Sequence, residues 1–147
     1  LPQPLSIIDR LVGGRPPAED VSTLVNTISR DLLYLLNSWE ILNLNSVTTN
    51  EDLSTSVLNY GVINMVGRSI RSDSLQKYEE AVIHAIKNFE PRLDPSTLEV
   101  RAFNTKSPGE GASFSLTIEA ELAGLENRRR VIFRSKINTT SGRATLI

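Results

Sequence analysis

The chain of 147 residues contains no cysteine and a single histidine. The absence of cysteine excludes a disulfide framework and thiolate metal sites, and it suits a reducing compartment. The longest purely apolar run covers residues 32–36, far short of the roughly 20 residues that a membrane-spanning helix needs. The N-terminus also lacks the basic segment and apolar run of a secretory signal. We therefore expect a soluble chain that works in the cytoplasm.

The sequence also has no large excess of positive or of negative charge. The sequence has 16 basic and 17 acidic side chains and a net charge of -1, so it offers no global field that would attract nucleic acid or anionic lipid. The length and the 39% hydrophobic content fit one domain with a real core. A Gly-Gly-Arg-Pro-Pro run at residues 13–17 breaks the chain early. We expect an N-terminal arm over residues 1–19 and a single domain over residues 20–147.

Two stretches carry apolar residues at helical spacing, residues 20–36 and residues 73–89. Asp20 or Ser22 is suited to cap the first helix, and Asp73 and Gln76 have the spacing of a capping box at the start of the second. Between them, the Asn, Ser and Thr residues at 43–55 predict a surface loop. A short helix over residues 52–59 would carry Leu53, Val57 and Leu58 inward, and Gly61 would close it in a left-handed conformation.

After Pro95 the apolar pattern changes to a period of two, which predicts half-exposed strands. We expect strands over residues 98–103, 114–122 and 131–137, with a short fourth strand over residues 143–147. Helices followed by consecutive strands indicate an α+β fold, in which N-terminal helices pack on one face of a small antiparallel sheet formed by the C-terminal half. The other face or an edge of that sheet is the natural place for a partner.

No glycine-rich phosphate loop, zinc-ligand cluster or nucleophile elbow occurs in the sequence. The segment from Gly109 to Gly111 lies between two predicted strands and is typical of a hairpin loop. His84 lies beside the apolar stripe of the second helix, where a packed structural histidine is the simpler interpretation. We therefore predict no catalytic residue, no cofactor and no metal.

The basic residues concentrate on and before the third predicted strand. Alternation along a strand places only part of this set on one face, and Glu119 and Glu121 on the neighbouring strand are positioned to neutralise it. Two interpretations follow: a solvated sheet face, or a contact with an acidic protein through Arg130 and Arg134. Nucleic acid is disfavoured, because sheets that bind RNA add exposed aromatic residues. The basic residues are Arg128, Arg129, Arg130, Arg134 and Lys136.

A proline-centred corner ends the second helix. Pro91 lacks a backbone donor and disfavours helical geometry at Glu90, so Glu90 and Arg92 flank the stop. In one interpretation these two side chains satisfy each other, a neighbouring loop or the helix-end carbonyls. In the other, they form a rigid surface fork that recognises a complementary charged segment of another subunit.

Residues 57–61 (Val-Leu-Asn-Tyr-Gly) and residues 89–93 (Phe-Glu-Pro-Arg-Leu) enclose the second helix. With the strands that follow, they resemble the baseplate wedge proteins of contractile injection machines, and most closely the TssE family of bacterial type VI secretion. The resemblance covers most of the chain, including the front segment at residues 5–11 and the Arg-Asp-Leu of residues 30–32. It implies that Glu90, Pro91 and Arg92 form the functional corner, with Tyr60 as a further partner-binding residue.

The same resemblance implies the partners. The subunit would join TssF, TssG and TssK in wedges around the VgrG spike and help to start assembly of the TssB/TssC sheath. Its exposed strands would offer backbone edges to a sheath segment. Assembly would take place in the cytoplasm, at the inner membrane of a Gram-negative bacterium.

Two alternatives stay open. The family has also been labelled lysozyme-like, and Glu90, Glu99 and Thr105 have the spacing of the catalytic residues of phage-type lysozymes, with Glu in place of the usual Asp. Retaining hydrolysis needs two carboxyl groups about 5 Å apart, whereas strand alternation turns Glu99 to solvent. The second alternative is a free regulatory adaptor protein. We expect binding and not turnover.

Overall fold

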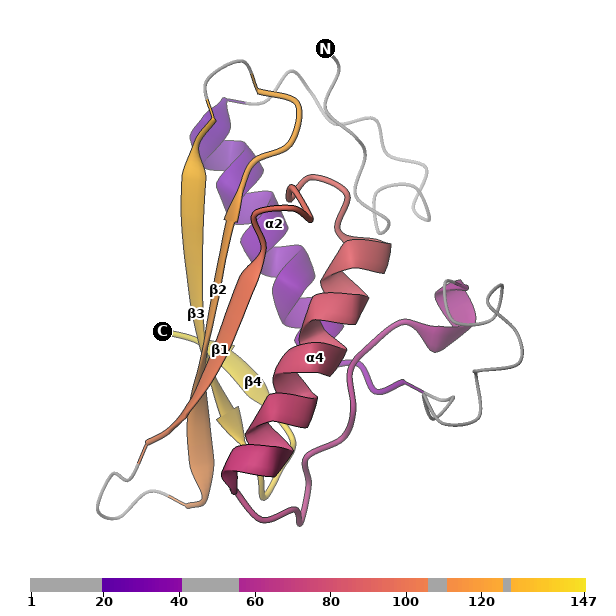
Figure 1. The fold of residues 1–147 in the computed structure, drawn as a ribbon, viewed down its shortest axis with the longest axis vertical. Coiled ribbons are helices and arrows are strands. Elements are labelled where there is room, and N and C mark those ends of the chain that lie inside the picture. The colour runs from indigo at the N-terminus through magenta and orange to yellow at the C-terminus, as the bar shows by residue number, and fades with distance from the viewer. Residues whose placement is uncertain (1–19, 41–55, 106–110, 126–127) are drawn as a thin grey trace.

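The computed structural model describes residues 20–40, 56–105, 111–125 and 128–147. They form two α-helices and four strands, together with the short 3-10 turn η1 (Val57–Asn59). Figure 1 shows both helices on the same side of the sheet, so the predicted α+β fold is confirmed. The helices are α2 (Val21–Leu36) and α4 (Ser72–Phe89), and the strands are β1 (Glu99–Asn104), β2 (Ser113–Glu121), β3 (Arg130–Asn138) and β4 (Ala144–Leu146).

The four strands form one antiparallel meander in the order β1-β2-β3-β4. Alternate residues of β2 are fully buried and face the helices, as their period predicted: Phe114, Leu116, Ile118 and Ala120. In β3 the same alternation buries Val131, Phe133 and Ile137. The opposite set of side chains makes up a second face, which we call the outer face of the sheet. The outer face includes Glu99, Arg101, Phe103, Thr117, Glu119, Arg130, Ile132, Arg134 and Lys136.

Helix α2 begins at Val21, one residue later than expected, and Asp20, one of the two caps that the sequence predicted, is its N-cap. The carboxylate of Asp20 accepts hydrogen bonds from the backbone N–H of Ser22 at 2.8 Å and from its hydroxyl at 2.7 Å. These bonds satisfy one of the amide donors that a helix start leaves without an intrahelical partner. The apolar stripe of α2 is buried against α4 and the sheet.

Helix α4 begins one residue earlier than expected, at Ser72, and the predicted capping box is wrong. Arg71 holds the N-cap position and makes no side-chain cap bond. Asp73 consequently falls inside the first turn, where its charge still favours the positive end of the helix dipole. Gln76 instead donates to Glu80 at 3.2 Å, one turn further along the helix.

The segment after η1 passes close to the end of α2. Val57 is 48% exposed, so its predicted inward position is wrong. Gly61 has φ +135°, outside the left-handed helical conformation that we expected, and a Cβ there would lie 2.5 Å from the carbonyl oxygen of Ser38. Only glycine lets the two backbones approach so closely, and the next residue, Val62, forms a parallel bridge with Trp39.

The predicted loop over residues 43–55, the first half of the predicted helix over residues 52–59 and the N-terminal arm lie outside the described residues. Within the described ranges, no helix combines the length and the apolar character that crossing a membrane requires.

Candidate functional site

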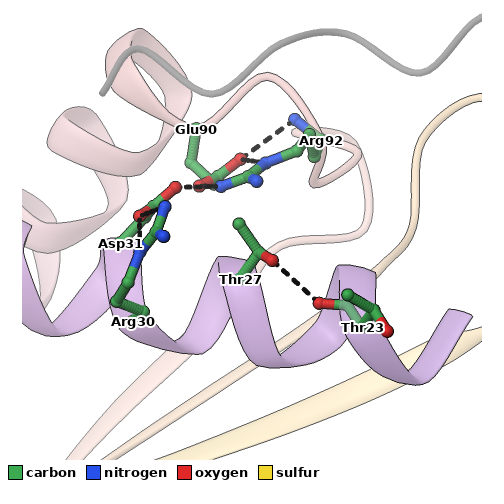
Figure 2. Close-up of polar contacts among 6 residues, drawn as sticks. All are labelled: Thr23, Thr27, Arg30, Asp31, Glu90 and Arg92. Atoms are coloured by element: carbon green, nitrogen blue, oxygen red, sulfur yellow. Dashed lines mark hydrogen bonds and ion pairs between the residues drawn. The ribbon is translucent and has the colours of Figure 1, made fainter. Parts of the chain in front are cut away.

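A cluster of three buried charged residues joins the end of α4 to the middle of α2. Arg92, Glu90 and Asp31 are 3%, 4% and 5% exposed. Arg92 donates from Nε to Glu90 Oε1 and from Nη2 to both Glu90 Oε2 and Asp31 Oδ2, each at 2.7 Å. Figure 2 shows the guanidinium lying between the two carboxylates. The geometry is that of a bidentate pair with a third, shared contact.

The charges of this cluster are balanced by a second arginine. Arg30, about half exposed, contacts Asp31 Oδ1 through Nε at 2.8 Å and through Nη2 at 2.7 Å. Burial opposes the charge on Arg92, but the hydrogen bonds and charges of Glu90 and Asp31 outweigh it and raise the pKa of Arg92. Thr27, which Figure 2 also draws, donates to the carbonyl of Thr23 along α2 and so does not join the cluster.

The backbone of the corner is attached to the end of β2. The carbonyl of Arg92 accepts from the N–H of Ala123 at 2.8 Å, and the N–H of Asp94 donates to the carbonyl of Glu121 at 2.8 Å. Between them, the buried Leu93 forms an antiparallel bridge with Leu122. The corner therefore fixes the end of α4 to both α2 and the sheet.

The expectation of a surface fork at Glu90 and Arg92 is wrong. Their polar atoms face each other and Asp31, because a guanidinium excluded from water needs carboxylate partners at hydrogen-bond distance. The structure instead matches the first interpretation, in which the two residues satisfy each other. Pro91, between them, is exposed. The part that Glu90, Pro91 and Arg92 play in partner binding stays a prediction.

Asp31 entered the sequence analysis only within the Arg-Asp-Leu of residues 30–32 and was given no role in a site. It lies on the buried stripe of α2, three residues after Ile28 and four before Leu35. A carboxylate at that phase of an amphipathic helix must be paired once it is buried. That signal predicts a cationic partner elsewhere in the chain, although not which one.

Tyr60 lies beside the corner, and its part in partner binding stays a prediction. Its ring packs edge-on against Phe89, with 5.2 Å between the ring centroids. Burial raises the pKa of the Tyr60 hydroxyl, and the charges of Asp31 and Glu90 raise it further. The side chain is half-buried, so Tyr60 both packs against the corner and presents part of its surface to solvent.

The basic residues of β3 divide into two groups on the outer face. Arg130 lies 3.1 Å from Glu119 and 3.4 Å from Glu99, and Arg128 lies 3.7 Å from Glu121. The predicted cross-strand neutralisation is therefore confirmed at this end of the sheet. Arg134 lies further along β3 and is exposed. Within the described ranges it forms no ion pair.

The edges of the sheet differ in how they are covered. On β1, the N–H of Ala102 donates to a carboxylate oxygen of Glu79 from α4 at 2.6 Å. On β4, Ala144 donates to Asn37 at 2.9 Å, and Asn37 returns a hydrogen bond to the carbonyl of Ala144 at 3.1 Å. The side chains of Glu79 on α4 and of Asn37, the C-cap of α2, thus occupy backbone groups that an added strand would need.

The first half of β3 has no such cover from a strand. Strand β4 pairs only with Ser135 to Ile137. The bonds between Asn138 and Arg143 and between Arg134 and Ile147 show that even-numbered residues of β3 direct their backbone groups toward the β4 side. The N–H and C=O of Ile132 therefore point to an edge that no strand of the described chain occupies. We call residues 130–133 of β3 the open edge, because the carbonyl of Arg134 already accepts from the N–H of Ile147.

The sequence profile of one protein family, described as baseplate wedge protein gp25, matches residues 22–126. This match covers more than half of the chain. The chain belongs to the gp25 family of baseplate wedge proteins. No curated protein and no solved structure matches it.

As a gp25-family protein, the chain is a structural baseplate component. The matched region contains α4, β1, β2 and all of α2 except Val21, and with them the whole of the buried cluster. The open edge and the residues Arg130 and Arg134 lie beyond the match.

The geometry of this gp25-family protein gives the muramidase alternative no support. Glu90 is buried and shares Arg92 with Asp31 of α2, on the side of the sheet that the helices cover. Glu99 points outward and pairs with Arg101 and Arg130. A retaining glycosidase needs both carboxyl groups about 5 Å apart and facing one sugar cleft. Thr105, the third residue of that spacing, donates to the carbonyl of Ser113 at 3.5 Å.

Proposed function

We propose that this gp25-family chain is the wedge subunit of a type VI secretion machine. In this proposal it binds TssF, TssG and TssK in the wedge, near the VgrG spike, and helps to start assembly of the TssB/TssC sheath. The chain would work in the cytoplasm, where the baseplate meets the inner membrane of a Gram-negative bacterium. The Asn-Tyr-Gly and Glu-Pro-Arg elements that the sequence shares with the TssE family support this choice of machine.

The observation that carries the proposal is the open edge of β3. Unpaired N–H and C=O groups along a strand are a template for an incoming strand of another protein. Two other edges of the sheet are occupied by Glu79 and Asn37, whereas the edge at Ile132 has no strand partner among the described residues. A segment of the sheath or of a wedge protein would add at this edge.

The corner plays a different part in the same proposal. The buried cluster of Asp31, Glu90 and Arg92 holds the end of α4 rigidly, so Pro91 and Tyr60 form a preorganised surface. Preorganisation raises affinity because little conformational freedom is lost on binding. A wedge protein would contact Pro91 and Tyr60, while the open edge receives the sheath segment.

The test compares two substitutions at Ile132. Ile132→Pro removes the N–H that points outward, whereas Ile132→Ala keeps it and removes only the side chain. Because that N–H does not pair with β2, thermal unfolding should show that both variants fold. Each variant is then co-expressed with TssF, TssG, TssK and TssB/TssC, and wedge recovery and sheath assembly are measured.

We expect Ile132→Pro to abolish sheath assembly and leave recovery of the wedge proteins intact, and Ile132→Ala to retain most of both. Normal sheath assembly with Ile132→Pro would exclude strand addition at this edge. Failure of the unsubstituted chain to bind any of these partners would exclude the type VI assignment and leave the gp25 family membership in place.

A further inference from the structure

A pocket of about 360 Å³, lined mainly by polar and basic residues, opens on the outer face, at the end of the sheet where β2 begins and β3 ends. It is distinct from the buried cluster, which lies on the helix side. In Figure 1 this end of the sheet is the lower one, at the opposite end from the corner that follows α4. The side chains that line it are Ser113, Lys136, Asn138, Ser141, Arg143 and Thr145. None of them is acidic.

Ser113 gives the first indication of a ligand. Its side chain is 4% exposed, and among the residues that the structure describes its hydroxyl oxygen has no hydrogen-bond partner. A buried hydroxyl without a partner is unfavourable, and most such groups in folded proteins are satisfied. A ligand in the pocket that accepts a hydrogen bond from Ser113 would remove this deficit.

The neighbouring groups are arranged to donate as well. The carbonyl oxygen of the Asn138 side chain already accepts from the N–H groups of Thr140 at 2.8 Å and Ser141 at 3.0 Å. The amide nitrogen of Asn138 is the half of that side chain that can serve a ligand. Arg143 is exposed and adds a permanent positive charge at the rim. A pocket of donors beside a cation fits an oxyanion.

We propose that this pocket binds the carboxylate of an acidic segment on a neighbouring protein. Positive charge continues from the pocket along β3, because Lys136 and Arg134 share the outer face at two-residue spacing. In one row across the sheet, Ser115 of β2 lies between Lys136 of β3 and Phe103 of β1, and Phe103 is 50% exposed. An extended chain places alternate side chains on one side at the same spacing. An acidic segment running along β3 would therefore meet the pocket and these cations in turn.

The same face argues against a nucleic acid in this position. Glu99 and Glu119 occupy the outer face further along the sheet and hold Arg130 in ion pairs. A phosphate backbone continuing past Arg134 would meet these carboxylates, whereas a short acidic peptide ends before them. The proposal uses the face of the sheet and not its open edge, so it does not depend on strand addition at Ile132.

The experiment measures binding of a fluorescent hexaglutamate peptide to the purified chain by anisotropy, with a hexaglutamine peptide as the neutral probe. Arg143→Gln removes the rim cation and Ser113→Ala removes the unpaired hydroxyl. Arg129→Gln is the matched control, because it removes the same charge from an exposed position just before the opposite end of β3.

We expect Arg143→Gln to weaken hexaglutamate binding about tenfold and Ser113→Ala several-fold, as for lost hydrogen bonds to a charged group. Arg129→Gln should change it by less than about twofold, in keeping with a screened surface charge. Ser113→Ala should also leave the melting temperature unchanged or raise it, because it removes a buried group that has no partner. Weaker hexaglutamate binding without a lower melting temperature would show that Ser113 acts in binding and not in stabilising the fold.

Other results overturn the proposal. Equal binding of hexaglutamate by the Arg143→Gln and Arg129→Gln variants would mean a general surface charge effect. Binding of inorganic phosphate with the same variant dependence, without binding of hexaglutamate, would mean a small-anion site. Tighter binding of a single-stranded oligonucleotide that is lost in Arg143→Gln would mean a nucleic-acid surface. A melting temperature lowered by Ser113→Ala would mean that the hydroxyl stabilises the fold.

Discussion

Replacing Arg92 with methionine tests whether the buried cluster holds the fold together. The substitution removes three hydrogen bonds of 2.7 Å to Glu90 and Asp31. Methionine fills the space of the arginine stem but not of the guanidinium, and two carboxylates remain without their shared cation. Removing one partner of a buried ion pair costs about 3–5 kcal/mol of the free energy of unfolding. For a domain of this size that corresponds to a melting temperature lower by roughly 6–20 °C.

The chain supplies a matched control. Arg101 also follows a glutamate by two residues and lies 3.3 Å from Glu99, but both side chains are largely exposed. An exposed pair contributes at most about 1 kcal/mol, so Arg101→Met should change the free energy of unfolding far less than Arg92→Met. Urea unfolding followed by circular dichroism measures both variants under identical conditions.

A rescue experiment completes this test. Neutral replacements that keep the shape of the carboxylates, Asp31→Asn and Glu90→Gln, should recover part of the stability lost in Arg92→Met, since no unpaired charge is then buried. If Arg92→Met costs no more than Arg101→Met, or if the neutral replacements give no recovery, the paired charges of the cluster do not stabilise the fold.

Three further predictions concern single positions. Pro91→Ala should leave the melting temperature nearly unchanged yet reduce co-purification of wedge proteins; unchanged co-purification would mean that Pro91 only ends the helix. Gly61→Ala should destabilise the chain much more than Gly67→Ala in thermal unfolding, because a Cβ at Gly61 would lie 2.5 Å from the Ser38 oxygen while Gly67 has nothing within 4 Å; equal effects would refute the close-approach argument. Hydrogen bonds from Ser22 lower the pKa of Asp20 from its ordinary value of 3.8. The stability that the Asp20 carboxylate contributes is therefore present above pH 3.8 and is lost as the pH falls through the lower pKa of the folded state. Asp20→Ala should be less stable than the parent at pH 7, and the difference in their free energies of unfolding should disappear in acid.

The strands were predictable from the sequence because the alternation of apolar and polar residues agrees with the face of the sheet that each residue occupies. In β2, five outward residues of polar or charged type alternate with four apolar ones, and a shift of register by one residue would bury charge. The first helix was predicted for the same reason, since its apolar stripe and its Asp20 cap indicate the same start. The capping box at Asp73 and Gln76, which was predicted from their spacing alone, did not form.

The pairing within the candidate site could not be predicted from local patterns. Asp31 and Arg92 are 61 positions apart, and nothing in the periodicity of α2 or α4 indicates which cation Asp31 meets. The proline signal correctly ended the helix at Glu90, but it carries no information on whether the flanking charges face water. That outcome depends on how α2 packs beside the end of α4, which is a tertiary property.

The charges around the open edge narrow the choice of occupant. An unprotected strand edge invites pairing between copies of one protein, and natural proteins place charges there to prevent it. In an antiparallel pairing of two copies centred on Ile132, Arg130 of each copy would lie opposite Arg134 of the other. Like charges directly opposite are destabilising, although Glu99 and Glu119 already neutralise part of the charge of Arg130. A strand with an acidic residue opposite Arg134 would pair with it, so the edge favours a different protein over a second copy of the chain.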